Sequence, residues 1–180
     1  MTTQYTPTLK LALPVTGELS GTWGDVVNDN ITSMIEQAIA GLATISTWTT
    51  NSHTLTTANG TTSESRCAML VAENGAGLSA AGEIICPAAA KLYVLQNNTS
   101  YAITLKTSGG SGVAVASGET VYLFCDGTDV NACVTTIVNA TTIDTTNLEV
   151  TNIKAKDGTA SIALADSTGV ATFSANPILS

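Results

Sequence analysis

Apolar residues recur at three- and four-residue spacing between residues 23 and 42, and this period predicts one amphipathic helix. Pro7 and Pro14 exclude a helix from residues 1–21, so an extended arm is expected ahead of it. Thr22 is placed to cap the helix with its hydroxyl, with Asp25 in the first turn as in a capping box. The apolar stripe consists of Val27, Ile31, Met34, Ile35, Ala38, Ile39 and Leu42.

This stripe needs one partner surface. The partner is either the same helix in sister chains or the globular segment that follows, and the residues alone do not decide between the two. Both arrangements are compatible with a cluster of chains around a threefold axis.

From residue 48 to residue 139 the period changes to short apolar–polar alternation interrupted by Gly, Asn, Asp and Ser turns. The runs predict strands at 66–72, 82–86, 91–96, 101–107, 112–116, 120–125 and 130–138. Short strands at this regular spacing are typical of an antiparallel β-sandwich or jelly roll. Only this segment is long enough to form a core of its own.

Residues 140–180 carry brief apolar patches separated by turns, too few for a stable monomeric core. The chain is therefore predicted to be mainly β, in three parts. These are an N-terminal arm and helix (1–47), a small β-sandwich (48–139) and the start of a β-shaft or linker (140–180).

Composition narrows the function classes. The chain of 180 residues has a net charge of −8, with 44% hydrophobic and 11% charged residues, and the acidic residues are spread along its length. Without a basic stripe, binding to nucleic acid or to an anionic membrane is disfavoured. Neither a secretion signal nor an apolar run long enough to cross a membrane is visible.

Candidate chemistry is sparse. Cys67, Cys86, Cys125 and Cys133 lack metal-ligand spacing and are expected to be reduced, buried side chains, although Cys125 and Cys133 flank a turn and could face each other. The single histidine, His53, is expected to be a solvated loop residue rather than a catalytic base. No metal, cofactor or catalytic residue is predicted.

Two further patterns fail their templates. The glycines of residues 108–112 are not followed by the Lys and Ser or Thr of a phosphate-binding loop. Asp126, Asp129 and Asn131 lack the alternate spacing and distal Glu of a calcium loop, and turn formation explains them.

The segment LPVTGELSGTWGDVVN (residues 13–28) resembles the assembly region that opens tail-fibre and appendage proteins of tailed bacteriophages, especially marine and cyanobacterial phages. The runs LYVLQNNTSYAITLKT (92–107), GVAVASG (112–118) and FCDG (124–127) resemble a small β-domain of such proteins. The resemblance implies a virion structural protein that is made in the host cytoplasm and is not an enzyme. It further implies that residues 140–180 begin a trimeric β-shaft.

The expected role is the N-terminal, tail-attaching part of a tail fibre. A homotrimer would dock on adaptor- or nozzle-type tail proteins, and host receptors would be bound only through a C-terminal extension. A large aromatic at a helix start is suited to fill a partner's pocket. The expected partner-binding residues are Trp23, Gly24, Asp25, Val27, Ile31, Met34 and Ile35.

Two alternatives belong to other classes. A head-decoration, cement or tail-adaptor protein would use the same β-domain to bridge subunits of the virion. A polysaccharide-binding or depolymerase spike ranks last, because both tryptophans precede residue 50 and the β-domain lacks an aromatic platform for sugars.

Overall fold

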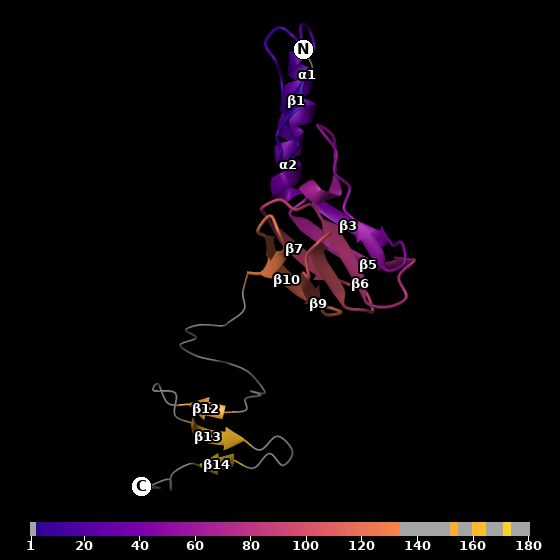
Figure 1. The fold of residues 1–180 in the computed structure, drawn as a ribbon. Helices are drawn as coiled ribbons and strands as arrows, with labels where there is room; N and C mark the ends of the chain where they lie inside the picture. The colour runs from indigo at the N-terminus through magenta and orange to yellow at the C-terminus, as the bar shows by residue number, and fades with distance from the viewer. Residues whose placement is uncertain (1–2, 134–151, 155–159, 165–170, 174–180) are drawn as a thin grey trace. The chain divides into compact units, whose positions relative to one another are not determined.

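The computed structural model describes residues 3–133, 152–154, 160–164 and 171–173. The chain divides into two compact units, Met1–Thr136 and Ile137–Ser180. The described residues form one interrupted helix and several small sheets, which confirms the prediction of a mainly-β chain (Figure 1).

The N-terminal arm is a short hairpin followed by a loop. Strand β1 (Gln4–Tyr5) pairs antiparallel with β2 (Ala12–Leu13). The helix then runs from residue 23 to residue 40, which agrees with the predicted helix. Its three consecutive parts are α1 (Trp23–Val27), the π-helical turn η1 (Asn28–Thr32) and α2 (Ser33–Ala40).

Two details of the helix differ from expectation. Thr22 occupies the N-cap position, but its side chain makes no capping hydrogen bond, so the predicted capping box is wrong. The residues of the predicted apolar stripe do not share one environment, because some are buried and others are exposed to solvent. Met34 is buried, whereas Ile35 and Ile39 are exposed over 40% and 74% of their surface.

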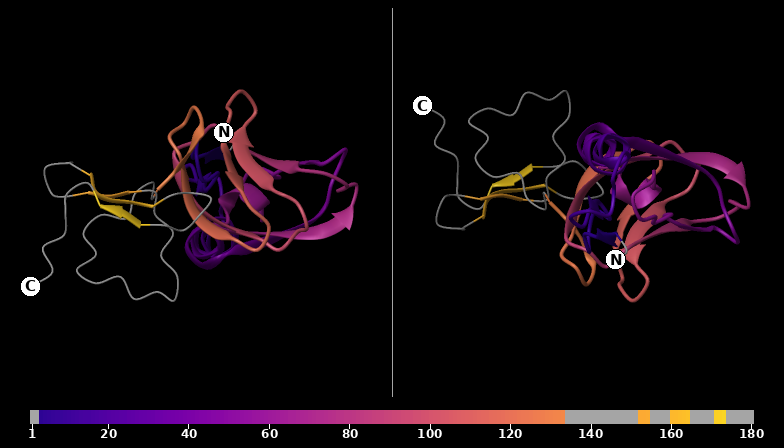
Figure 2. Two further views of the ribbon diagram at one scale, coloured as in Figure 1. Left: turned by 90° about the horizontal axis from the view of Figure 1, so that it is seen from below. Right: turned by 90° about the horizontal axis from the view of Figure 1, so that it is seen from above.

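Nine strands between residues 42 and 132 form the β-sandwich, whose two layers are seen in Figures 1 and 2. The five-stranded sheet has the order β11-β10-β7-β5-β3, and the four-stranded sheet has the order β4-β6-β8-β9. The strands are β3 (Leu42–Thr47), β4 (Ser52–Thr54), β5 (Met69–Ala76), β6 (Gly82–Cys86), β7 (Lys91–Asn97), β8 (Ile103–Thr107), β9 (Val113–Val115), β10 (Thr120–Cys125) and β11 (Val130–Ala132).

The sheets are mixed, which corrects the prediction of an antiparallel sandwich. From β3 to β8 successive strands alternate between the two sheets, so the neighbours within each sheet are parallel. The chain therefore winds like a short coil, adding one strand to each sheet per turn. Only β9, β10 and β11 return antiparallel. Regular strand spacing fits both arrangements, because it does not say to which sheet the next strand belongs.

The coil begins earlier than the sequence pattern suggested. Strand β3 lies in the segment assigned to the arm and helix, and β4 lies where His53 was expected in a loop. Strand β5 continues through Gly75 to Ala76, beyond the predicted strand end at residue 72. A Cβ at Gly75 would overlap the Ser46 carbonyl oxygen, so this glycine permits close approach of β3 and β5 rather than a turn.

One core lies between the two sheets, and every strand from β3 to β11 except β4 contributes to it. Tyr93, Ile84, Leu95, Ile103 and Leu105 are at most 1% exposed. The complete buried cluster comprises Ala43, Ile45, Trp48, Leu55, Cys67, Leu70, Ala72, Ile84, Cys86, Tyr93, Leu95, Ile103, Leu105, Val115, Leu123, Cys125 and Val130.

The second unit contains an antiparallel sheet of β12 (Asn152–Lys154), β13 (Ala160–Leu164) and β14 (Ala171–Phe173). Its strands lie in the segment expected to begin a β-shaft. The predicted strand residues 134–138 and the linker-like ending at 175–180 lie outside the described residues.

The cysteines differ in burial. Cys67, Cys86 and Cys125 are buried as predicted, but Cys133 is exposed, so that part of the prediction is wrong. Cys125 pairs with Val130 across the hairpin, whereas the Cys133 amide bonds to the Tyr122 carbonyl oxygen at 3.0 Å. Cys125 and Cys133 therefore do not face each other.

Alkylation should distinguish these thiols. Burial raises the pKa of Cys86 to about 12, with the neighbouring Cys125 adding to the shift. In dilute native protein we expect iodoacetamide to modify Cys133 at least tenfold faster than Cys67, Cys86 or Cys125. Peptide mass spectrometry measures the four rates, and similar rates before denaturation would contradict the buried placement.

Candidate functional site

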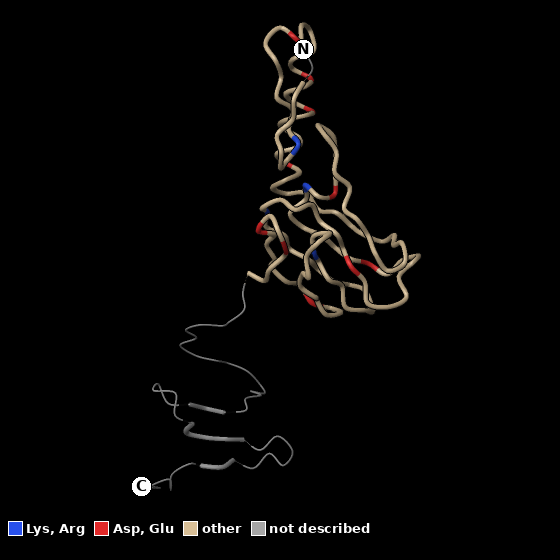
Figure 3. The backbone as a smooth tube through the Cα atoms, in the orientation of Figure 1, with Lys and Arg blue, Asp and Glu red and all other residues tan. Residues whose placement is uncertain are grey.

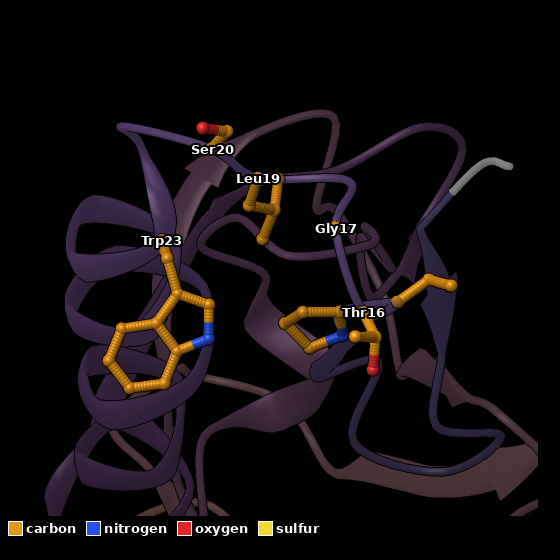
Figure 4. Close-up of a pocket in the computed structure, with 7 residues that line it drawn as sticks. Thr16, Gly17, Leu19, Ser20 and Trp23 are labelled. Atoms are coloured by element: carbon orange, nitrogen blue, oxygen red, sulfur yellow. The ribbon is translucent and has the colours of Figure 1, made fainter.

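The predicted anchor residue lines an open hollow in the loop between the hairpin and the helix. Trp23 is 62% exposed, the most exposed aromatic side chain among the described residues. Its indole faces Leu19 and Thr16 of the loop across the hollow (Figure 4). The hollow has a volume of about 470 Å³, and it is lined by Pro14, Val15, Thr16, Gly17, Leu19, Ser20 and Trp23.

This geometry changes how the tryptophan can bind. The sequence suggested a knob that fills a pocket on a partner, whereas Trp23 forms one wall of a groove on its own chain. A hollow lined by an indole together with leucine and proline can receive an apolar side chain from a partner.

The other predicted site residues fall into two groups. Gly24 and Asp25 are exposed beside Trp23, and a Cβ at Gly24 would meet no atom within 4 Å. Val27 and Ile31 are half-buried. Met34 is buried and Ile35 is exposed, so the set does not form one continuous contact surface.

Arg66 connects the arm, the helix and the sandwich. It precedes β5 in the 3-10 turn η2 (Glu64–Arg66) and is only 2% exposed. Its guanidinium donates to neutral acceptors of three separate segments. These acceptors are the Leu9 carbonyl at 2.8 Å, the Ala58 carbonyl at 2.9 Å, the Thr61 carbonyl at 2.6 Å, Gln37 Oε1 at 2.7 Å and Met34 Sδ at 3.0 Å.

No carboxylate is among the acceptors of this buried cation. Burial lowers the pKa of Arg66, as expected where the charged form loses water. The rigid fork of donors lets one side chain bond to several acceptors at once. Arg66 therefore sets the position of the arm and helix on the sandwich. The sequence does not reveal this role, since a single arginine in a Ser-rich stretch gives no periodic signal.

The structure corrects the expectation for His53. Its side chain is only 16% exposed, and Nε2 lies 3.0 Å from Glu64 Oε2. Nδ1 lies 2.9 Å from the Thr47 carbonyl oxygen, and the ring makes an edge contact with Trp48. Both ring nitrogens are therefore engaged.

Glu64 is held by more than the histidine. Burial alone would raise its pKa, but hydrogen bonds from the Thr56 amide and from His53 bring the pKa below its ordinary value. A free base beside a nucleophile is needed for acyl transfer. The hydroxyl of Ser52, the neighbour of His53, instead donates to Glu83 at 3.2 Å. The contact between His53 and Glu64 joins β4 to the 3-10 turn η2 that precedes β5.

The glycine-rich loop at 108–112 is filled by the chain's own carboxylate. Asp129 accepts hydrogen bonds from the amides of Ser111 at 2.7 Å and Gly112 at 3.0 Å. Together with the Val130 amide, these bonds lower the pKa of Asp129. The amides that would bind a phosphate are thus occupied, and Asp126 likewise accepts from the amides of Thr128 and Asp129.

Charge is spread thinly over the described part of the chain, with acidic positions in both the arm and the sandwich (Figure 3). Among the described residues, no group of three or more His, Cys, Asp or Glu side chains could hold a metal ion. Within the same residues, no helix combines the length and the apolar character needed to cross a membrane.

Searches against protein-family models, curated proteins and solved structures find no match.

Proposed function

We propose that this chain is a structural protein of a bacteriophage virion, the N-terminal part of a tail fibre that attaches to the tail. The observation that carries the proposal is the exposed Trp23 at the wall of an open hollow, on an arm outside the core. This position lies within the segment 13–28, whose sequence resembles phage assembly regions. Large aromatics in such positions dominate protein–protein contacts.

The Arg66 hydrogen bonds support an anchoring role. An anchor transmits load only if its docking element is fixed to the rest of the molecule. Arg66 joins Leu9 of the arm to Gln37 of the helix and to the loop before β5. The hollow at Trp23 is thereby held at the end of a braced element rather than on a free tail.

The contacts of the polar residues favour a structural role over an enzymatic one. His53, Glu64 and Asp129 are each engaged in hydrogen bonds that connect neighbouring segments. The proposed assembly is a homotrimer in which residues 140–180 start a shaft, with adaptor- or nozzle-type tail proteins as the docking partners. Its location is the virion tail.

The Trp23→Ala substitution tests this function. We expect phages carrying it to lose the appendage at least tenfold, because truncating an aromatic anchor costs about 2 kcal/mol or more at each contact. The melting temperature of the isolated protein should stay within about 2 °C of the wild type, since Trp23 contributes no buried core surface. Electron micrographs and quantitative immunoblots of purified virions measure the occupancy.

Tyr101→Ala is the matched control, because Tyr101 is also a partly exposed aromatic but lies on the sandwich. It should leave occupancy unchanged. Normal occupancy in Trp23→Ala virions would contradict the docking role. Antibody labelling over the head instead of the tail would favour the decoration protein.

A further inference from the structure

The outer face of the five-stranded sheet carries a continuous row of apolar side chains. Strand register places Leu42 of β3 opposite Met69 of β5, Met69 opposite Val94 of β7, and Val94 opposite Tyr122 of β10. Alternation puts these residues on the face opposite the core, as their exposed fractions show. The values are 53% for Leu42, 36% for Met69 and 58% for Tyr122.

A further apolar pair lies beside this row. Leu92 and Phe124 form the next outward-facing pair across β7 and β10, at 52% and 39% exposure. The outer apolar face is defined by six residues, which are Leu42, Met69, Leu92, Val94, Tyr122 and Phe124.

The polarity changes abruptly along the same sheet. The next outward-facing row, two residues further along β3, consists of Thr44, Val71, Gln96 and Thr120. Three of these four side chains are polar, as expected for a sheet face in water. The apolar residues therefore gather at one end of the face.

The size of this face matches the apolar part of a protein interface. The exposed fractions of its five large side chains with a value above one third together equal about 2.4 whole residues, or on the order of 500 Å² at roughly 200 Å² each. Each partner contributes ~800 Å² to a standard interface, and a little over half of that area is non-polar. Patches of this extent are among the largest that monomers expose, and they often mark a binding surface.

Charge points to the identity of the partner. The two outward rows from Leu42 to Tyr122 and from Leu92 to Phe124 contain no Asp, Glu, Lys or Arg. The chain carries a net charge of −8, so two copies repel each other wherever acidic residues meet. An uncharged apolar face is the region through which copies of an acidic chain can approach.

We propose that this face binds further copies of the same chain and is the lateral contact of the assembled appendage. The inference deepens the proposed function and rests on it only for the biological setting. It assigns the contact between copies to the outer face of the five-stranded sheet, and leaves the hollow at Trp23 for the tail partner.

Cys133 is a native reporter of this contact. Its amide bonds to the Tyr122 carbonyl, which places it at the end of the Leu42–Tyr122 row, and it is exposed. The full-length protein is treated with a maleimide at nanomolar and at tens-of-micromolar concentration, and the rate at Cys133 is measured. Sedimentation velocity gives the mass at the same concentrations. We expect a multiple of 18.3 kDa at the higher concentration and at least tenfold slower labelling of Cys133.

The variant Leu92→Glu/Tyr122→Glu places carboxylates on the face without touching the core. It should label at the same fast rate at both concentrations. Thr120→Glu is the matched control, because Thr120 lies on the same strand and face, two residues from Tyr122, in the polar row. It should behave as the wild type does.

Two results would overturn the proposal. One is a wild-type chain that stays a monomer at tens of micromolar. The other is an oligomer in which Cys133 labels equally fast at both concentrations, since the copies would then meet elsewhere. Both readouts use the wild type, so a double variant that fails to fold does not weaken the test. The Trp23→Ala occupancy experiment is separate, and either result can fail without the other.

Discussion

Replacing Arg66 by methionine should lower the free energy of unfolding by about 3 kcal/mol or more, because several buried acceptors lose a charged donor at once. The carbonyl oxygens of Leu9, Ala58 and Thr61 would remain in place without this partner. Methionine keeps much of the apolar volume, so the loss reports the hydrogen bonds rather than a cavity. Urea unfolding followed by circular dichroism measures it.

The same substitution should release the arm and helix before the sandwich unfolds. Limited proteolysis is expected to cleave within residues 1–41 of Arg66→Met at least tenfold faster than in the wild type, while the sandwich persists. Lys106→Met is the matched control, since it removes a positive charge whose ion pair with Glu83, at 3.5 Å, lies near the surface. It should cost at most about 1 kcal/mol. Equal losses in the two variants would show that Arg66 does not brace the arm.

The Gly77→Ala substitution should destabilise the protein by about 3 kcal/mol, the second-largest effect expected here. Gly77 follows β5 with a φ of +86°, in the region that favours glycine. A Cβ there would also overlap the Trp48 carbonyl oxygen, and backbone cannot move aside as a flexible side chain does. The hydrogen bond from the Trp48 amide to the Ala76 carbonyl, 2.9 Å long, would be displaced.

The Gly118→Ala substitution separates backbone strain at positive φ from steric overlap of the added Cβ. Gly118 has a φ of +82°, but a Cβ there would meet no atom within 4 Å. Its substitution should cost only the backbone strain of about 1 kcal/mol. Thermal and urea melts of both variants measure the difference. A loss at Gly77 no larger than that at Gly118 would contradict the close approach of β3 to the end of β5.

The helix shows what a periodic pattern can and cannot specify. The spacing predicts a helix from residue 23 to about residue 42. The helix ends at residue 40, because Gly41 is extended and Leu42 begins β3. The spacing does not specify which surface each face of the helix contacts. Met34 packs beneath Arg66 while Ile39 stays exposed, because the coiled sheets and the arm cover only one side of the helix.

The strands show the same division. Alternation located the segments from β5 to β11 to within a few residues, because inward and outward positions differ in burial. It missed β3 and β4, whose Thr-rich runs give little contrast between faces. It also ended the predicted strand at residue 96, although Asn97 belongs to β7, is fully buried and donates its side-chain amide to the carbonyls of Tyr101 and Val115.

The sequence by itself determined a mainly-β chain with one helix, an acidic surface, and an exposed tryptophan at a helix start. Those properties depend on composition and on the local spacing of apolar residues, so they can be predicted from the sequence. Only the tertiary structure decided that the sheets are mixed, that Arg66 joins three segments and that His53 meets Glu64. Each of these depends on which distant residues the coil brings together. Residues far apart in sequence meet through the winding of the backbone, and no local period encodes that winding.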